Sequence, residues 1–148
     1  MIKHEILTMI ESMIDETHTA VLSTVDSSGA PHSRWITPGI LGDRTGVIFM
    51  ISGSNLAKVD QIKGNPYVNM LFQTKSLDKI VSVEGKVNIV ENPSIRSEVL
   101  EYVGKHLHAF WKINSPEKEL VVLELIIEQA TLSIPLSGSK LTVKFAGE

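Results

Sequence analysis

The stretch that decides the fold runs from residue 19 to residue 72 and reads TAVLSTVDSSGAPHSRWITPGILGDRTGVIFMISGSNLAKVDQIKGNPYVNMLF. Residues 19–26 are rich in β-branched and apolar side chains, and the DSSG segment that follows has the chemistry of a turn. A second strand passes through Trp35 and Ile36, so the two strands are expected to pair as a hairpin. Residues 47–51 (VIFMI) are continuously apolar, which predicts a strand covered on both faces at the centre of the core.

Between these strands and residue 72 the sequence predicts a short helix. The turn 52–55 (SGSN) leads into it, Ser54 is its expected N-cap, and Gly64 ends it. The first amides of a helix lack intrahelical acceptors and the helix dipole favours an anion there. Lys58 on this helix and Arg34 on the second strand of the hairpin therefore indicate a phosphate site. The alternative reading, in which Ser54 only caps a surface helix and Lys58 is solvated, remains open at this point.

The rest of the chain supplies further strands and accessory helices. Apolar residues recur at helical spacing near the N-terminus: Ile2, Ile6, Met9, Ile10, Met13 and Ile14. Strands are expected at 67–74, 80–90, 119–130 and 140–145, and a helix from Asn92 to about Leu107. Gly85 interrupts a clean alternation, which indicates a β-bulge or a close approach of backbone. Strands in hairpin order predict a mainly β protein, a closed antiparallel barrel with no long exposed edge.

Composition limits the class of protein. The 148 residues predict a single domain, 1–148, and 43% hydrophobic with 21% charged residues is ordinary for a soluble globular protein. A formal net charge of −3 without a run of basic residues argues against nucleic-acid binding. The absence of cysteine removes thiolate metal sites and cysteine nucleophiles. No signal peptide or membrane span is expected, and cytoplasmic localisation is the default.

Several of these residues, taken in register, resemble one known family, the pyridoxamine 5'-phosphate oxidase-like FMN-binding split barrels, and within it the short general stress protein branch. The resemblance covers roughly residues 5–130. The matching positions are Ser23-Thr24-Val25-Asp26, Gly29-x-Pro31, Arg34, Phe49, Lys58 and Asn65-Pro66 with Val68.

The resemblance implies an antiparallel split barrel of Greek-key type and a homodimer with FMN at the subunit interface. Carried over by position, Arg34 and Lys58 would hold the flavin phosphate with help from Ser52 and Ser54. Trp35, Ile36 and Thr37 would lie along the isoalloxazine ring, mainly through backbone amides, and Ile51 completes the predicted cofactor site. The implied function is that of an FMN-dependent oxidoreductase whose substrate and electron donor are unassigned. No catalytic side chain and no metal is predicted.

Two departures from the family pattern limit this reading. The oxidase proper has a C-terminal tail rich in Arg and Trp, whereas this sequence ends KLTVKFAGE. The short branch tends to have a Trp soon after the alanine of its last long strand, where this sequence has Ala130-Thr131-Leu132. Vitamin B6 oxidation is therefore not expected. The alternatives are a flavin-binding module without turnover, and a haem or deazaflavin binder on the same barrel.

The histidines and one aromatic pair have structural readings beside the functional ones. His106 and His108 are two residues apart, so they do not share a helix face, and no ligand set stands near them. His32 lies two residues before Arg34, and in a strand both side chains emerge on the same face, where His32 could join the phosphate or substrate mouth. Phe110 and Trp111 are read as a hydrophobic anchor or as a lid from the partner subunit.

Overall fold

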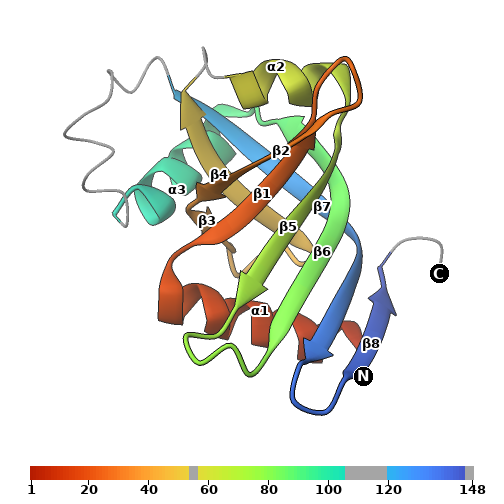
Figure 1. The fold of residues 1–148 in the computed structure, drawn as a ribbon. Coiled ribbons are helices and arrows are strands. Elements are labelled where there is room, and N and C mark those ends of the chain that lie inside the picture. The colour runs from red at the N-terminus through yellow and green to blue at the C-terminus, as the bar shows by residue number, and fades with distance from the viewer. Residues whose placement is uncertain (54–56, 106–119, 146–148) are drawn as a thin grey trace.

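The computed structural model describes residues 1–53, 57–105 and 120–145. Within them eleven elements follow one another along the chain (Figure 1). Their bounds are α1 Lys3–Thr17, β1 Ala20–Val25, β2 Pro31–Ile36, β3 Pro38–Gly39, β4 Val47–Gly53, α2 Ala57–Gly64, β5 Tyr67–Gln73, β6 Ile80–Ile89, α3 Pro93–Gly104, β7 Leu120–Ile134 and β8 Ser139–Lys144. None of the helices in this part of the chain has the length and hydropathy of a membrane-spanning segment.

All strands belong to one antiparallel sheet that curls around its core. The strand order is β2-β1-β5-β6-β7-β4-β3, and β8 pairs with β7 outside this path. The predicted β1–β2 hairpin is confirmed, with Ala20 opposite Ile36 and Val25 opposite Pro31. Neighbours such as β1 with β5, and β4 with β7, are distant in sequence, as in Greek-key connections. The mainly β, split-barrel fold class is thereby confirmed.

The hydrogen-bonded path is not closed, which corrects the expectation of a closed barrel without long exposed edges. Among the described residues β2 and β3 form the two ends of the path, and no ladder joins them. Only Thr37 separates these two strands. One residue is too short a connection for two consecutive strands to fold back on each other, so β2 keeps an open edge.

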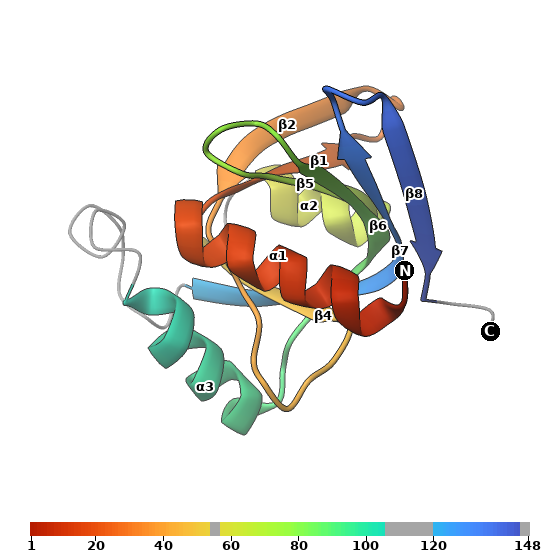
Figure 2. The same ribbon diagram turned by 90° about the horizontal axis from the view of Figure 1, so that it is seen from below.

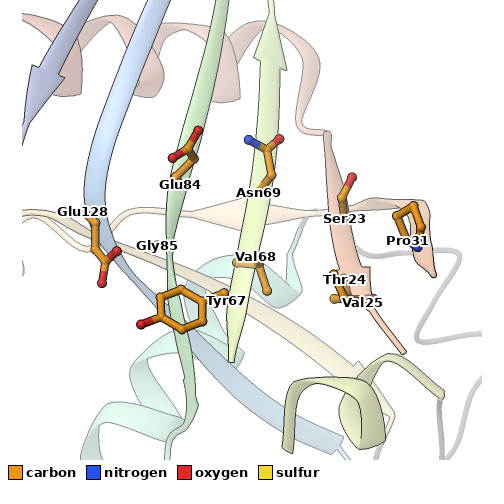
Figure 3. Close-up of a pocket in the computed structure, with 10 residues that line it drawn as sticks. All are labelled: Ser23, Thr24, Val25, Pro31, Tyr67, Val68, Asn69, Glu84, Gly85 and Glu128. Carbon is orange, nitrogen blue, oxygen red and sulfur yellow. The ribbon is translucent and has the colours of Figure 1, made fainter. Parts of the chain in front are cut away.

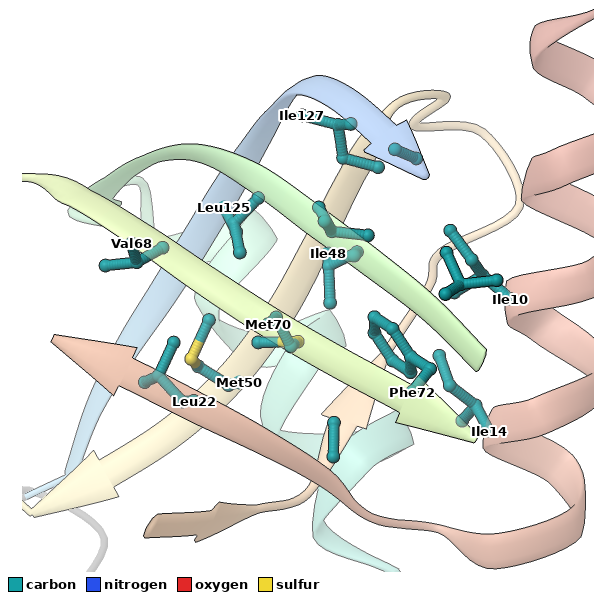
Figure 4. Close-up of a cluster of buried hydrophobic side chains, with 14 of the residues drawn as sticks. Ile10, Ile14, Leu22, Ile48, Met50, Val68, Met70, Phe72, Leu125 and Ile127 are labelled. Carbon is teal, nitrogen blue, oxygen red and sulfur yellow. The ribbon is translucent and has the colours of Figure 1, made fainter. Parts of the chain in front are cut away.

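β4 lies at the centre of the core, as its apolar run predicted. Its side chains alternate between two buried clusters. Ile48 and Met50 belong to the larger cluster, inside the curl of the sheet, together with Met70 and Leu125 (Figure 4). Phe49 belongs to the smaller cluster, which α3 covers. The strand is therefore covered on both faces.

The predicted irregularity at Gly85 is a β-bulge. The register between β6 and β7 shifts between Glu84 and Gly85. A Cβ atom at Gly85 would meet the backbone oxygen of Ile126 at 2.2 Å, a separation that no side chain tolerates. The bulge thus combines an extra residue, Glu128 in the partner strand β7, with a close backbone approach at Gly85, and it bends the sheet.

The two helices α1 and α2 lie at opposite ends of the curled sheet (Figures 1 and 2). α1 covers one end and buries an apolar stripe, Ile6, Leu7, Ile10, Met13 and Ile14. Ile10 and Ile14 point toward Phe72 of β5 (Figure 4). Ile2, which the periodicity included, precedes the helix and is 64% exposed.

α3 and β7 differ from their predicted bounds at their ends. α3 begins as expected, because the Asn92 side chain accepts hydrogen bonds from the amides of Ser94 at 2.9 Å and Ile95 at 3.2 Å. It is described as far as Gly104, and the expected end near Leu107 lies outside the described residues. β7 continues to Ile134, beyond the predicted Ala130, because β8 pairs with its second half.

Candidate functional site

The site is built on the β1–β2 hairpin. In its register Leu22 faces Arg34 and Thr24 faces His32. Residues that face each other across an antiparallel pair share one side of the sheet, so Arg34 and His32 lie on the same side as buried Leu22 and Thr24. Trp35 follows Arg34 and therefore lies on the opposite, outer side, where it is 67% exposed.

Asp26 organises the turn of this hairpin. Its Oδ1 accepts hydrogen bonds from the Ser28 amide at 2.9 Å, the Ser28 hydroxyl at 2.6 Å and the Ala30 amide at 3.0 Å. Its Oδ2 lies 2.7 Å from Nε2 of His32. These contacts, the Ser28 hydroxyl first and His32 second, hold the pKa of the Asp26 carboxyl well below its ordinary value. The carboxylate is therefore bound by its own turn, and His32 contacts it.

Arg34 belongs to a closed ring of three hydrogen bonds. Its Nη1 donates to the Thr24 hydroxyl at 2.8 Å, and its Nη2 donates to Oε1 of Gln61 at 3.3 Å. The Thr24 hydroxyl in turn donates to the same Oε1 at 2.5 Å. Nη1 also donates to the backbone oxygen of Leu22 at 3.2 Å. The ring joins β1, β2 and α2, and it fixes the orientation of the guanidinium.

The charge of Arg34 is not neutralised by these contacts. All of its acceptors are neutral, and among the described residues no carboxylate lies within salt-bridge distance of it. Partial burial lowers the pKa of Arg34, but an arginine remains protonated at neutral pH. A partly desolvated cation that has no counter-ion gains from the approach of an anion. This donor set fits the phosphate of FMN, which needs charge-assisted donors held in place.

The remaining predicted site residues fall into three groups. Ile36 is buried and Thr37 is half-buried, and both follow directly on Arg34 and Trp35. Ile51 and Ser52 are buried at the end of β4, where the Ser52 hydroxyl donates to the backbone oxygen of Gly53 at 3.2 Å. Lys58 is the second residue of α2. Its side chain and Ser54 lie outside what the structure describes.

The structure thus brings Arg34 together with α2, the helix that carries Lys58, through Gln61. β4 and β2 lie far apart along the hydrogen-bonded path of the sheet, at its second-last and first positions. Ser52 lies at the end of β4, and α2 is the next element in the chain. The structure thus joins Arg34 to α2 directly, whereas Ser52 is related to this helix by its position in the sequence.

Sequence reasoning missed the roles of Thr24 and Gln61. Thr24 is the hydroxyl on the buried side of β1, two residues after Leu22, and a polar residue in that register needs a partner. Gln61 follows Lys58 by three residues and so lies on nearby parts of the same helix surface. Both signals are in the sequence, but neither identifies the hydrogen-bond partner, which lies on another strand or helix.

A pocket of about 310 Å³ lies on the outer side of the sheet (Figure 3). Its lining spreads over β1, β2, β5, β6 and β7 and includes Ser23, Tyr67 and the carboxylates Glu84 and Glu128. Tyr67 is 54% exposed, and its ring centre lies 4.9 Å from Nζ of Lys86. None of the predicted cofactor residues whose side chains the structure describes lines this pocket.

A second pocket, of about 460 Å³, separates the hairpin turn from the C-terminal half of α2. Asp26 lines it from the turn, and Gln61 and Asp60 line it from the helix. Gln61 therefore accepts a hydrogen bond from Arg34 and also lines this pocket. Among the described side chains, those of the predicted cofactor residues do not line this pocket either.

Comparison with known sequences identifies one family. The model of the pyridoxamine 5'-phosphate oxidase family matches residues 6–133. The pyridoxine/pyridoxamine 5'-phosphate oxidase of Shewanella halifaxensis is 30% identical over 137 residues, which are 92% of this chain and 56% of that protein. The corresponding enzyme of Pseudomonas putida is 36% identical over 75 residues, which are 51% of this chain and 34% of that protein. The chain thus matches between about a third and about a half of the length of these curated relatives.

Solved structures share the fold at low sequence identity. A Clostridium acetobutylicum protein related to general stress protein 26 has a TM-score of 0.75 at 12% identity, with 97% of each chain covered. A Nostoc punctiforme protein, described as pyridoxamine 5'-phosphate oxidase-related and FMN-binding, has a TM-score of 0.65 at 12% identity, covering 97% of this chain and 96% of its own. A heme-binding protein of Mycobacterium smegmatis has a TM-score of 0.74 at 13% identity, covering 91% of this chain and 56% of its own.

Proposed function

The chain belongs to the pyridoxamine 5'-phosphate oxidase family, and from that premise we propose that it is an FMN-binding flavoprotein with oxidoreductase activity. The observation that carries the proposal is the half-buried Arg34 guanidinium, which has only neutral acceptors among the described residues. A phosphate monoester carries nearly two negative charges at neutral pH, and arginine binds such a group through directed, charge-assisted hydrogen bonds.

The phosphate end of FMN would be held at the start of α2. Arg34 reaches this helix through Gln61, and Lys58 is the second residue of the helix. A helix N-terminus adds amide donors and a favourable dipole for an anion. Ser52, at the end of β4, and Ser54 complete the proposed set of phosphate residues. Two cations and a helix terminus together match the charge of the phosphate.

The ring end of FMN would lie along β2. This strand pairs only with β1 among the described residues, so amides on its other edge have no ladder partner. Trp35, Ile36 and Thr37 are proposed to lie along the isoalloxazine ring and to present to it those of their amides that face the open edge. Ile51 would give apolar cover. The open edge, which sequence analysis did not expect, supports this placement because a closed ladder would leave no donors.

A homodimer with flavin at the interface is part of the same proposal. The outer side of the sheet exposes Trp35 and Tyr67, by 67% and 54% respectively, together with half-buried Val21 and Leu71 in the same registers. Exposed aromatic residues on a sheet face are typical of subunit contacts. A partner placed there would cover the edge of β2, where the ring is proposed to lie.

When bound, FMN supplies electron and hydride transfer between a donor such as a reduced nicotinamide and a small acceptor. The chain's own residues would bind the phosphate, orient the ring through β2 amides and limit the access of water. No side chain of the site is assigned a proton. Cytoplasmic localisation and the absence of nucleic-acid and membrane partners remain part of the proposal. The alternative assignments are a flavin-binding module without turnover and a haem or deazaflavin binder.

Absorption spectroscopy tests the proposal. Purified protein is titrated with FMN and, separately, with haem, and the FMN-loaded protein is then mixed anaerobically with NADPH or NADH. Flavin bands that shift on binding and bleach with a nicotinamide are the expected result. Bound flavin that no donor bleaches would favour the non-catalytic module. A Soret band on haem addition with no flavin binding would overturn the proposal in favour of the haem binder.

A further inference from the structure

We propose that Gln61 is a positioning residue for Arg34, one that sets the preference of the site for a phosphorylated ligand. It does so by holding the guanidinium with a neutral acceptor. The inference rests on the proposed FMN site and adds the reason why that site would distinguish FMN from riboflavin. It assigns a role in specificity to an α2 residue that is not itself expected to touch the ligand.

The hydrogen-bond directions in the ring are fixed by chemistry. Arginine only donates, so the atom of Gln61 that faces Nη2 must be the carbonyl oxygen and not the amide nitrogen. The Thr24 hydroxyl accepts from Nη1, so its own proton is free to go to the same Gln61 oxygen. Thr24 is completely buried, and both of these hydrogen bonds are made. The three side chains therefore have one consistent arrangement.

The type of residue at position 61 matters as much as its shape. A glutamate there would offer the same acceptor position to Thr24 and Arg34, but it would form an ion pair with the guanidinium. The cation would then already be neutralised, and a phosphate would meet a carboxylate beside its binding group. Because glutamine is neutral, the guanidinium is fixed in place while its charge stays available to a ligand.

The same contact links the two cations of the proposed site. Gln61 lies three residues after Lys58 on α2, and its side chain is bonded to Arg34 of β2. Residues three apart occupy neighbouring positions on a helix surface. The Gln61–Arg34 bond therefore sets the position of the guanidinium relative to the helix that carries the second cation.

The test compares Gln61→Glu with the matched control Gln73→Glu, which makes the same change of charge at the α1 end of β5. Dissociation constants for FMN and for riboflavin are measured by flavin fluorescence, and thermal unfolding checks the fold. Gln61→Glu is expected to raise the dissociation constant for FMN about tenfold or more, since hydrogen bonds to charged groups are worth ~1.5 to 3 kcal/mol. The dissociation constant for riboflavin is expected to change about twofold at most. A merely structural role would weaken both ligands equally.

A second variant covers the case in which Gln61→Glu does not fold. Thr24→Val keeps the shape but removes the hydroxyl of the ring, and it too is expected to reduce the ratio of FMN to riboflavin affinity. A wild-type preference for FMN that neither variant changes, relative to Gln73→Glu, would overturn the inference and leave the FMN proposal standing. Wild-type protein that binds the two flavins equally would overturn the phosphate assignment itself and the inference with it.

Discussion

The two ends of the curled sheet are built in opposite ways. At one end α1 covers the core with five apolar side chains and no buried polar group of its own. At the other end α2 packs Val59 and Ile62 inward, but it also contributes Gln61 to a polar ring with Thr24 and Arg34. The first end stabilises the fold through area removed from water. The second holds a cation in place, at the site where the phosphate of FMN is proposed to bind.

These two constructions are expected to serve stability and ligand binding separately. Burial of an Ile or Leu side chain contributes about 1.5 to 3 kcal/mol to the stability of the fold, whether or not a ligand is bound. A half-buried arginine with neutral acceptors keeps its charge available, so an anionic ligand can add charge-assisted hydrogen bonds to it. Changes at the α1 end should therefore alter stability without selectivity among ligands, and changes at the α2 end should alter ligand choice more than stability.

The largest expected effect is at the α1 end. Ile10 is completely buried, and Ile10→Ala should lower the free energy of unfolding by about 2 to 5 kcal/mol, because truncation leaves a cavity in the core. Denaturant unfolding measures this change. The control is Glu11→Ala, at an exposed neighbouring position of the same helix. The ratio of FMN to riboflavin affinity should stay unchanged in the folded variant, and a lowered ratio would contradict the division between the two ends.

The next effect is at the α2 end. Arg34→Ala and Lys58→Ala should each weaken FMN binding by ~1.5 to 3 kcal/mol, about 10-fold to 150-fold in affinity. Riboflavin binding should be much less affected. Isothermal titration calorimetry with both flavins measures the difference. Lys63→Ala, which removes an exposed cation near the C-terminus of α2, is the matched control. Equal losses for FMN and riboflavin would remove Arg34 and Lys58 from the phosphate site.

The smallest effect concerns the turn of the β1–β2 hairpin, beside the α2 end of the sheet. Because the pKa of Asp26 is lowered in the folded protein, the stability it contributes is fully present above its ordinary value of about 3.8 and is lost as the pH falls through the lowered pKa. The Ser28 and Ala30 amide signals in NMR should therefore titrate with a midpoint below 3.8. Asp26→Asn should abolish that titration. A midpoint at or above the ordinary value would show that these hydrogen bonds do not form.

Sequence reasoning predicted the features that depend on local pattern. The periodicity of α1, the apolar run of β4 and the bulge at Gly85 each follow from the order of neighbouring residues, and all three are confirmed. β3 was missed, because Pro38 and Gly39 are residues that strands usually avoid. The open edge at β2 was also missed, since closure of a ladder depends on the path of the whole chain.

The hydrogen-bonded ring of Arg34 shows more clearly what the sequence does not predict. Arg34 was identified as a candidate from its place in the motif, but its acceptors lie 10, 12 and 27 residues away along the chain. The Thr24–Gln61 bond spans 37 residues. No local pattern selects Gln61 over other polar residues of α2. Hydrogen bonds between distant elements are therefore visible only once the fold has placed the elements together.

A crystal structure of the protein grown with FMN would show whether Arg34 binds the phosphate. Phosphate oxygens are expected within hydrogen-bond distance of the Arg34 guanidinium, while Arg34 keeps its contacts with Thr24 and Gln61. A phosphate bound elsewhere, with Arg34 in its ring and no anion beside it, would contradict the claim that the neutral ring holds this cation for a phosphorylated ligand.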